Sequence, residues 1–401
     1  MRPLDGPRPL DGLRVLEVSS FVAAPLGGMT LAQLGAEVVR VDPPGGAPDV
    51  RRWPLAPSGR SIYWAGLNKG KRSVVVDQRS AEGREIVARL AAATGIVLTN
   101  ARRPSYADLV AARPDVIHLA IEGRHDGSPA VDYTVNAEMG FPLVTGPAAL
   151  DGPVNNVVPA WDVACGLYAA VGVLAAERHR VRTGEGRSIR LPLADVALAM
   201  LGNLGHLGEA RINGAGRPRI GNDLYGGFGR DFATSDGRRV MIVVLTERHF
   251  ADLGAMTGTA EVLAGLEKLL AADFGVDGDR YRHREAIAGL LAPWFADRTL
   301  GEVSRALAAT SVLWAPYRTF AEVAADPAVA ANPLLAELDQ PGIGRFLVPG
   351  SPLDLGGDAG RGAALAPEPG GDTGTVLAEM LAMGADEIAD LTGRGVVGGT
   401  V

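Results

Sequence analysis

Asp162 stands directly in front of a long uncharged stretch of the chain, and this position suits two different roles. The fourteen residues that follow, 163–176, carry no charge and have the composition of a buried helix. An aspartate at the start of a helix commonly caps it by accepting hydrogen bonds from free backbone N–H groups. The same place suits a nucleophile, because the helix dipole keeps a carboxylate ionised and apolar surroundings protect a covalent intermediate from water. The stretch itself leaves both interpretations open.

A basic loop offers a second kind of chemistry, the binding of phosphate. The run "GLNKGKRS" places Lys69, Lys71 and Arg72 just before a predicted strand. Ammonium and guanidinium groups in such a loop are suited to holding phosphate, although each could also be an ordinary solvated surface charge. We predict contacts with a phosphate-bearing ligand from Lys71 and Arg72.

Thiol and metal chemistry are not indicated. The single cysteine, Cys165, lies inside the uncharged stretch, so we expect a buried, inert thiol and no internal disulfide. The six histidines show neither H-x-x-x-H nor H-E-x-x-H spacing, and we expect no metal site. Only His125 falls in a loop from which it could reach a ligand.

The elements that must position these residues alternate between strands and helices. Apolar runs that predict strands lie at 13–20, 36–44, 72–78, 95–100 and 115–123, and helical periodicity covers 24–35 and 80–94, with Ser80 as a cap. Such alternation is typical of a parallel α/β sheet. Ligands bind at the carboxyl ends of the strands of such sheets, and this predicts a pocket lined by Phe21, Val22, Ala23, Asp42 and Asn100.

A dinucleotide site is not expected in that pocket. The turn "SSFVAAPLGG" after the first strand lacks the G-x-G-x-x-G spacing that brings the backbone close to a pyrophosphate. Asp42 ends the second strand, where a ribose-binding acid would lie, but an acid alone is a weak signal.

The composition of the chain changes twice along its length. This pattern predicts a large domain that is made of two separate parts of the sequence. A long helix after Asp162, a strand at 186–195 and a helix at 195–212 are followed by a glycine- and arginine-rich stretch, 213–239, with the composition of a linker. We predict a large domain at 1–215, a small domain with its linkers at 216–334, and a return to the large domain at 335–401.

Composition excludes several classes of partner. The 401 residues carry a formal net charge of −7 and no basic stripe, which argues against binding to nucleic acid. The longest uncharged run is too short to span a bilayer, and the N-terminal residues lack the apolar stretch of a signal peptide. We expect a cytoplasmic protein without a membrane partner.

Five stretches of the chain resemble the class III CoA-transferase family. They are "LDGLRVLEVSSFVAAPLGGMTLAQLGAEVVRVDPPGG", "LNKGKRSVVVD", "PAWDVACGLYAAVGVLAAERHRVRTGEGRSIRLPLAD", "VLWAPYRTFAEVAADP" and "ADEIADLTGRGVV", in the family's own order. The resemblance implies a Rossmann-like large domain made from both chain ends, an inserted small domain and an interlocked homodimer. It also implies an acyl-CoA substrate, with coenzyme A as part of that substrate and no metal or redox cofactor.

The resemblance assigns roles to particular residues. In the family a single aspartate, lying before the long helix that ends in a "TGxG" turn, is the nucleophile; Asp162 matches it, with the turn at 183–186. Arg230 is a candidate to hold a free substrate carboxylate. The remaining implied positions are Asp132 near the nucleophile, a glycine loop over the site formed by Gly226, Gly227 and Gly229, and CoA contacts from Phe21, Val22, Ala23, Pro43, Val76 and Asn100. Lys71 and Arg72 of the basic loop are added to these CoA contacts as phosphate-binding candidates.

A narrower resemblance concerns the reaction. The runs "WAGLNKGKRS", "VDYTVN", "PAWD", "GRDF" and "WAPYRT" are similar to a branch of the family that moves CoA between the two carboxyl groups of one dicarboxylic acid. Val22 and Asn136 stand where many other members carry glutamine. Related racemases pair their aspartate with a histidine in "GHD", but Val131 takes that place here. We expect intramolecular CoA transfer, with transfer between two separate acids as the alternative and racemisation, using His125, as a weaker one.

Overall fold

The chain forms two compact units in the computed structural model, which describes residues 8–214, 216–355 and 363–398. The first unit contains the residues up to 139, 156–212 and those from 326 onward, and the second contains 140–155 and 213–325. The sequence placed the breaks at 215, which lies outside the described residues, and near 335. Segment 140–155, which the sequence analysis assigned to the large domain, belongs to the second unit.

The first unit is built on a seven-stranded, mostly parallel sheet. Its strand order is β12-β3-β2-β1-β4-β5-β6, and only the edge strand β12 runs antiparallel to its neighbour. The strands are β1 (Arg14–Val18), β2 (Glu37–Asp42), β3 (Arg72–Val76), β4 (Ile96–Thr99), β5 (Ile117–Glu122), β6 (Arg187–Pro192) and β12 (Val397–Gly398). The predicted α/β class is therefore confirmed. The order of the parallel strands reverses between β1 and β4, which creates a crevice at their carboxyl ends.

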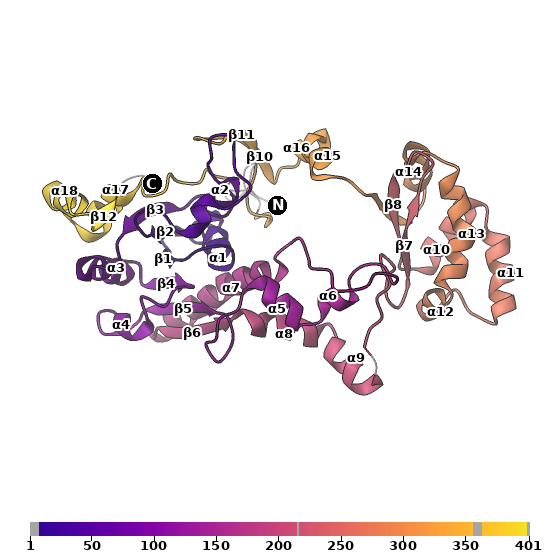
Figure 1. Cartoon of the computed structure of the whole chain (residues 1–401), viewed down its shortest axis with the longest axis horizontal. Helices are drawn as coiled ribbons and strands as arrows, with labels where there is room; N and C mark the ends of the chain where they lie inside the picture. The colour runs from indigo at the N-terminus through magenta and orange to yellow at the C-terminus, as the bar shows by residue number, and fades with distance from the viewer. Residues whose placement is uncertain (1–7, 215, 356–362, 399–401) are drawn as a thin grey trace. The chain divides into compact units, whose positions relative to one another are not determined.

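Helices cover both faces of this sheet. α3, α17 and α18 pack on one face, while α1 and α7 lie on the other (Figure 1). The helices of this unit are α1 (Ala23–Gln33), η1 (Pro48–Arg51), α2 (Ile62–Leu67), α3 (Ala81–Thr94), α4 (Tyr106–Val110), α5 (Asp132–Glu138), α7 (Ala160–Thr183), α8 (Leu193–Asn203), α9 (His206–Asn213), α16 (Pro327–Ala330), α17 (Thr373–Leu381) and α18 (Ala385–Gly393). A separate hairpin consists of β10 (Leu335–Gln340) and β11 (Gly344–Pro349).

Local sequence signals explain where several elements begin and end. The Ser80 hydroxyl accepts a hydrogen bond from the backbone N–H of Gly83, as predicted for the start of α3, and Gly95 ends that helix in the left-handed region. The predicted helix at 195–212 is instead two helices, α8 and α9, because Gly205 adopts a φ of 83° between them.

The "TGEG" turn connects α7 to β6 through two glycines with different tasks. Gly184 caps α7 with a φ of 77°. Gly186 lies against β5, where a Cβ would come within 2.2 Å of the carbonyl oxygen of Val116. Glycine is therefore required at both positions, the first for its conformation and the second for its size.

α1 and α7 pack with their backbones close together. A Cβ at Gly27 would lie 3.0 Å from the carbonyl oxygen of Gly166, and a Cβ at Gly166 would lie 2.6 Å from that of Ala23. These two glycines let the start of α1 approach α7 one turn after Asp162. α7 also has the length and mean hydropathy, 1.3, of a membrane span, with 39% of that window buried. The core helix of a soluble protein passes the same test of length and hydropathy, so these properties are only weak evidence that α7 spans a membrane.

The second unit has its own core around a three-stranded antiparallel sheet, β7-β8-β9. Phe232 on β7 stacks on Phe295 at a centroid distance of 4.4 Å. The stretch 213–239, predicted as a linker, contains all of β7. The elements are α6 (Phe141–Val144), β7 (Phe228–Ala233), β8 (Arg239–Val244), α10 (Glu247–Thr257), α11 (Ala260–Leu270), α12 (Asp277–Arg282), α13 (Arg284–Ala296), α14 (Leu300–Ala308), β9 (Leu313–Pro316) and α15 (Phe320–Ala325).

Candidate active site

Asp162 lies in the first turn of α7 but does not cap it. The N-cap position is Pro159, and the capping carboxylate comes from α5. Asp132 Oδ2 accepts hydrogen bonds from the backbone N–H groups of Trp161, at 2.8 Å, and of Asp162, at 3.1 Å. The cap interpretation of Asp162 is therefore wrong, because another carboxylate already occupies the free N–H groups. The side chain of Asp162 forms no hydrogen bond within the described residues.

The indole of Trp161 fixes the same turn from its other side. Its Nε1–H donates to Asn136 Oδ1 at 3.0 Å, and both side chains are buried. Asn136 lies one turn after Asp132 on α5, so one helix supplies two of the groups that hold the start of α7. The sequence singled out Asn136 only as a departure from a common glutamine. Its spacing of four residues from Asp132 was the signal for this shared role.

The pKa of the Asp162 carboxyl group lies closer to neutral pH than that of an ordinary aspartate. Burial, followed by the charge of Asp132, raises its pKa from 3.8 to about 6, while the charge of Arg52 lowers it. Burial and the charge of Asp162 also raise the pKa of Cys165 to about 12. The thiol is fully buried and neutral, in agreement with the expected inert cysteine. Asp162 is thus a partly desolvated carboxylate that is still ionised above pH 6.

The loops after β1 and β4 meet at the point where the strand order reverses. Asn100 Oδ1 accepts from the backbone N–H of Ser20 at 3.1 Å, and Asn100 Nδ2 donates to the carbonyl of Ser20 at 2.8 Å. Phe21 then adopts a φ of 68°, and α1 begins at Ala23. Since the carbonyl of Ala23 lies against Gly166, the predicted pocket residues Phe21, Ala23 and Asn100 lie near the first turns of α7.

A second group of residues, not predicted from the sequence, lies within electrostatic reach of Asp162. The guanidinium carbon of Arg52 lies 5.6 Å from the centre of the Phe21 ring and 5.0 Å from that of Tyr63. Burial raises the pKa of the Tyr63 phenol, Arg52 opposes the rise, and the charge of Asp162 adds to it. Arg52 and Tyr63 therefore lie within electrostatic reach of Asp162. Arg52 directly follows η1 and Tyr63 lies in the first turn of α2, two short helices that no local motif in the sequence marked.

A buried ion network lies beneath this group. Arg40 pairs with Asp42 at 2.9 Å and with Asp49 at 3.0 Å, and all three side chains are fully buried. Asp49 Oδ2 also accepts the backbone N–H of Phe21 at 3.0 Å. Asp42, predicted to line the ligand pocket, instead serves inside the fold. The network links β2 to the loop that follows β1.

Lys71 is part of the same interior rather than of a surface loop. Its Nζ donates to Glu17 at 2.9 Å, to the carbonyl of Pro25 at 2.9 Å and to Asn68 at 2.8 Å. Burial lowers the pKa of Lys71 to about 8, and the carboxylate of Glu17 opposes this shift. A Cβ at Gly28 would lie 1.8 Å from Glu17 Oε2, so α1 leaves room for the pair only with glycine there. With all three donors occupied, Lys71 is not arranged to hold a phosphate.

The other predicted CoA contacts differ in accessibility. The Arg72 guanidinium is held by Glu37 at 2.9 Å and by Glu379 at 2.7 Å. The side chain of Val76 is completely buried in the core beside α3. Pro43 is exposed at the end of β2, and Val22 is buried at the start of α1. Val76 can therefore offer a ligand only its backbone.

The predicted glycine loop belongs to the second unit. Gly226 has a φ of 79°, Gly227 follows it, and Gly229 lies on β7. Arg230, the candidate for a free substrate carboxylate, is paired with Asp223 at 3.3 Å and Glu285 at 2.9 Å. The arginine is thus already neutralised within its own unit.

The histidine-dependent alternative has little support. His125 is 80% exposed at its side chain and lies 4.0 Å from Asp195. Val131 occupies the N-cap position of α5, directly before Asp132. Across residues 8–214, 216–355 and 363–398, no three His, Cys, Asp or Glu side chains cluster to hold a metal.

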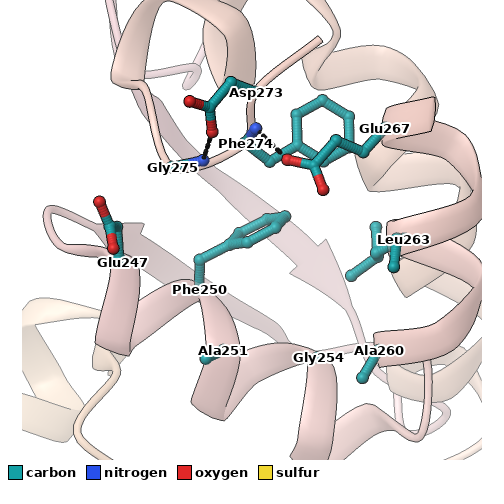
Figure 2. Close-up of a pocket in the computed structure, with 11 residues that line it drawn as sticks. Glu247, Phe250, Ala251, Gly254, Ala260, Leu263, Glu267, Asp273, Phe274 and Gly275 are labelled. Carbon is teal, nitrogen blue, oxygen red and sulfur yellow. Dashed lines mark hydrogen bonds between the residues drawn. The ribbon is translucent and has the colours of Figure 1, made fainter. Parts of the chain in front are cut away.

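A cavity of about 480 Å³ lies in the second unit (Figure 2). Three carboxylates line it, those of Glu247, Glu267 and Asp273. Glu267 accepts the backbone N–H of Phe274 at 2.5 Å, and Asp273 accepts that of Gly275 at 2.8 Å, so two of them hold the loop before α12 (Figure 2). Its negative charge is unsuited to the phosphates of CoA.

Known proteins share both the sequence and the fold of the chain. The pattern of CoA-transferase family III matches residues 10–373. The 2-methylfumaryl-CoA isomerase of Chloroflexus aurantiacus is 48% identical over 97% of this chain and 98% of its own length. Succinyl-CoA–D-citramalate CoA-transferase of the same organism is 27% identical over 98% of each chain. A crystal structure of a CAIB/BAIF family protein from Brucella suis has a TM-score of 0.78 at 27% identity, covering 94% of this chain and all of that one.

The chain belongs to CoA-transferase family III. The family resemblance predicted from five sequence stretches is confirmed, and so is the mostly parallel α/β fold.

Proposed function

We propose that the protein is an intramolecular CoA transferase that converts 2-methylfumaryl-CoA into 3-methylfumaryl-CoA. The observation that carries the proposal is the state of Asp162, a partly buried carboxylate with no hydrogen bond to its oxygens in the described part of the chain and a pKa of about 6. Such a group is ionised at neutral pH and poorly solvated, which suits nucleophilic attack. The 48% identical relative named 2-methylfumaryl-CoA isomerase supports the choice of substrate.

The first half of the reaction transfers the acyl group and then CoA to Asp162. A carboxylate oxygen of Asp162 attacks the C1 thioester carbon, the C–S bond breaks, and CoA thiolate leaves. The thiolate then attacks the aspartyl carbonyl of the mixed anhydride, and the anhydride C–O bond breaks to release mesaconate as a dicarboxylate. The product is an aspartyl-CoA thioester. Acyl activation is kept throughout, because no step uses water.

The second half repeats these steps on the other carboxyl group. The C4 carboxylate of the retained mesaconate attacks the aspartyl thioester and expels CoA thiolate. The thiolate attacks the C4 carbonyl of the new anhydride and frees the carboxylate of Asp162. No proton, electron or second substrate is consumed. Retention of mesaconate makes the acceptor effectively intramolecular, and this accounts for the rate advantage over an outside acid.

Coenzyme A is proposed to approach along the crevice between β1 and β4. Phe21, Val22, Ala23 and Asn100 are retained as contacts, and Pro43 as an accessible neighbour of the nucleotide. The free backbone N–H groups at the start of α1 suit phosphate oxygens. Lys71, Arg72 and Val76 are assigned structural roles instead. Gly226, Gly227 and Gly229 stay a prediction as a glycine loop over the site and as oxyanion donors.

Covalent trapping tests the nucleophile directly. Hydroxylamine added during turnover of 2-methylfumaryl-CoA should convert Asp162 to a hydroxamate, visible as a mass change on the peptide that contains residue 162. Asp132→Asn provides a folded comparison in which Asp162 is still present. Sustained turnover with Asp162 unmodified would overturn the proposal.

Transfer between separate acids is the second candidate, favoured by the 27% identical succinyl-CoA–D-citramalate CoA-transferase. Isotopically labelled mesaconate present during turnover distinguishes the two. We expect the label to enter the thioester far more slowly than isomerisation proceeds, because the retained acid outcompetes the outside one. Label entry as fast as isomerisation would favour the intermolecular reaction. Deuterium uptake at C2 in heavy water would instead indicate racemase chemistry.

A homodimer is also proposed. On α7, Leu167, Tyr168 and Val171 are 49%, 44% and 61% exposed, and Leu198 on α8 is 46% exposed. An apolar face on a long core helix is typical of a surface that another subunit covers. Light scattering should give a mass twice that of the chain. Val171→Glu should shift that mass toward the monomer, and a wild-type monomer would contradict the proposal.

A further inference from the structure

The guanidinium of Arg52 lies over two aromatic rings and forms no side-chain hydrogen bond to the described residues. Its guanidinium lies 5.6 Å from the ring of Phe21 and 5.0 Å from that of Tyr63. A cation held near aromatic rings uses its charge in these contacts, and the N–H groups of the guanidinium can still donate to a ligand. No carboxylate of residues 8–214, 216–355 or 363–398 forms an ion pair with Arg52. The guanidinium of Arg52 can therefore bind an anion that comes from outside the chain.

The backbone around Arg52 is fixed by the buried network. Its N–H donates to the carbonyl of Asp49 at 3.1 Å, and its carbonyl accepts from the Ser61 hydroxyl at 2.5 Å. Asp49 in turn accepts the N–H of Phe21 and pairs with Arg40. One buried carboxylate residue therefore positions both Arg52 and the ring that covers it. The backbone on both sides of the Arg52 side chain is therefore fixed by hydrogen bonds.

The location of Arg52 relates it to the nucleophile. The loop that carries Phe21 leads into Ala23, whose carbonyl lies against Gly166, one turn after Asp162 on α7. The charge of Arg52 also lowers the pKa of Asp162. When Asp162 is acylated it loses its negative charge, and a second anion at the site would then balance Arg52.

We propose that Arg52 binds the carboxylate of the acyl group that is not reacting, and so selects dicarboxylic acyl-CoA thioesters. The inference rests on the proposed function in taking Asp162 as the acylated residue. A guanidinium binds a carboxylate through two parallel N–H···O bonds, which also fixes its direction. Arg52 would grip the C4 carboxylate during attack at C1 and the C1 carboxylate during attack at C4. It takes the role first considered for Arg230, whose charge is already paired.

Equilibrium binding tests this role without turnover. In an Asp162→Asn protein, calorimetry compares 2-methylfumaryl-CoA with tiglyl-CoA, which has a methyl group in place of the free carboxylate. Charge-assisted hydrogen bonds should favour the dicarboxylic thioester by roughly 10- to 100-fold. The added change Arg52→Gln should reduce this preference to within about threefold, while tiglyl-CoA binds as before. The neighbouring exposed residue gives the control, Arg51→Gln, which should keep the preference.

Equal weakening of both ligands by Arg52→Gln, or an unchanged preference, would overturn the inference. Thermal unfolding followed by circular dichroism checks that each variant is folded. If Arg52→Gln does not fold, Arg52→Lys replaces it and should lower the preference about tenfold, because one ammonium cannot make the paired contact. Failure of the wild-type protein to isomerise 2-methylfumaryl-CoA, with the binding preference intact, would reject the proposed function and leave the role of Arg52 standing.

Discussion

At the scale of single residues, two aspartates divide the work at the start of α7: Asp132 caps the helix, and Asp162 is the candidate reactive group. Asp132 caps α7, and this leaves the oxygens of Asp162 without a hydrogen bond among the described residues. A capping carboxylate would be stabilised by N–H groups and would be a weaker nucleophile. Because Asp132 caps α7, Asp162 does not have to accept these hydrogen bonds, and this suits its proposed role as a nucleophile.

Burial of the charged carboxylate of Asp162 lowers the free energy of unfolding, and this effect can be measured. Its pKa rises from 3.8 to about 6 on folding, so the native state disfavours the charged form, and this group's contribution to stability is lost as the pH rises through that range. Asp162→Asn should abolish isomerisation and raise the free energy of unfolding at pH 8 by up to about 3 kcal/mol. Urea unfolding at pH 8 and pH 4 checks this. The gain should largely vanish at pH 4, and a loss of stability at pH 8 would contradict it.

The pH dependence of the rate should move in opposite directions when the two neighbouring charges are removed. kcat/KM of the wild type should fall below about pH 6, the pKa of Asp162. Asp132 raises that pKa, so Asp132→Asn should move the acid limb to lower pH. Arg52 lowers it, so Arg52→Gln should move the limb to higher pH. Profiles of kcat/KM between pH 4.5 and 8 provide the measurement, and shifts of the same sign would rule out this electrostatic account.

At the scale of elements, the packing of α1 on α7 brings the loop after β1 close to the first turns of α7, which carry Asp162. The two helices touch through Gly27 and Gly166, where side chains would separate them. The start of α1 at Ala23 and the start of α7 at Ala160 can then serve one site although they lie far apart in the sequence. In the loop after β1, the backbone N–H of Phe21 donates to Asp49, which in turn is paired with Arg40, so the buried network fixes this loop.

Enlarging Gly166 should therefore damage the site through packing. In Gly166→Ala the new Cβ would lie 2.6 Å from the carbonyl oxygen of Ala23, so α1 must shift. Overpacking of this kind costs about 1–3 kcal/mol. The rate of hydroxamate formation at Asp162 should fall roughly tenfold or more, since small displacements of reacting groups have large effects.

Gly208 on α9 supplies the matched control. A Cβ there would meet nothing within 4 Å, so Gly208→Ala should leave the rate unchanged and stabilise the helix slightly. Denaturant unfolding and single-turnover trapping of both variants decide the question. Equal behaviour of the two variants would mean that the α1–α7 contact does not position the site.

At the scale of the whole molecule, the first unit depends on both ends of the chain. β12 pairs with β3, and residues of α17 and α18 share one core with β1, β2 and α3. The unit cannot complete that core until the C-terminal residues have been made. The second unit has a core of its own.

A substitution near the C-terminus should therefore destabilise the N-terminal part of the sheet. Leu391→Ala removes a side chain that is 5% exposed in the shared core, and should cost about 2–5 kcal/mol. Hydrogen exchange should accelerate in β3 as well as in α18, because they unfold together. Glu387→Gln, on the exposed face of α18, is the control. Faster exchange confined to α18 would show that the C-terminal part unfolds independently.

Much of the fold could be predicted from the sequence because its signals are local. Apolar runs gave the parallel strands, Ser80 and Gly95 bounded α3, and the "TGEG" turn ended α7. The break at Gly205 and the strand inside the glycine-rich stretch were missed. Both involve glycine, which permits several backbone conformations, and the sequence does not show which of them tertiary packing selects.

By itself, the sequence determined the family and the alternation of strands and helices, and it predicted Asp162 as the central residue, because these depend on motifs and periodicity along the chain. Only the tertiary structure decided that Asp132 caps α7, that Lys71 is an interior ion-pair partner, and that Arg52 lies within electrostatic reach of Asp162. Each of these depends on which distant segments pack together. The same charged side chain can be a ligand contact or a core support, and its surroundings in space, with their burial and neighbouring charges, set its role.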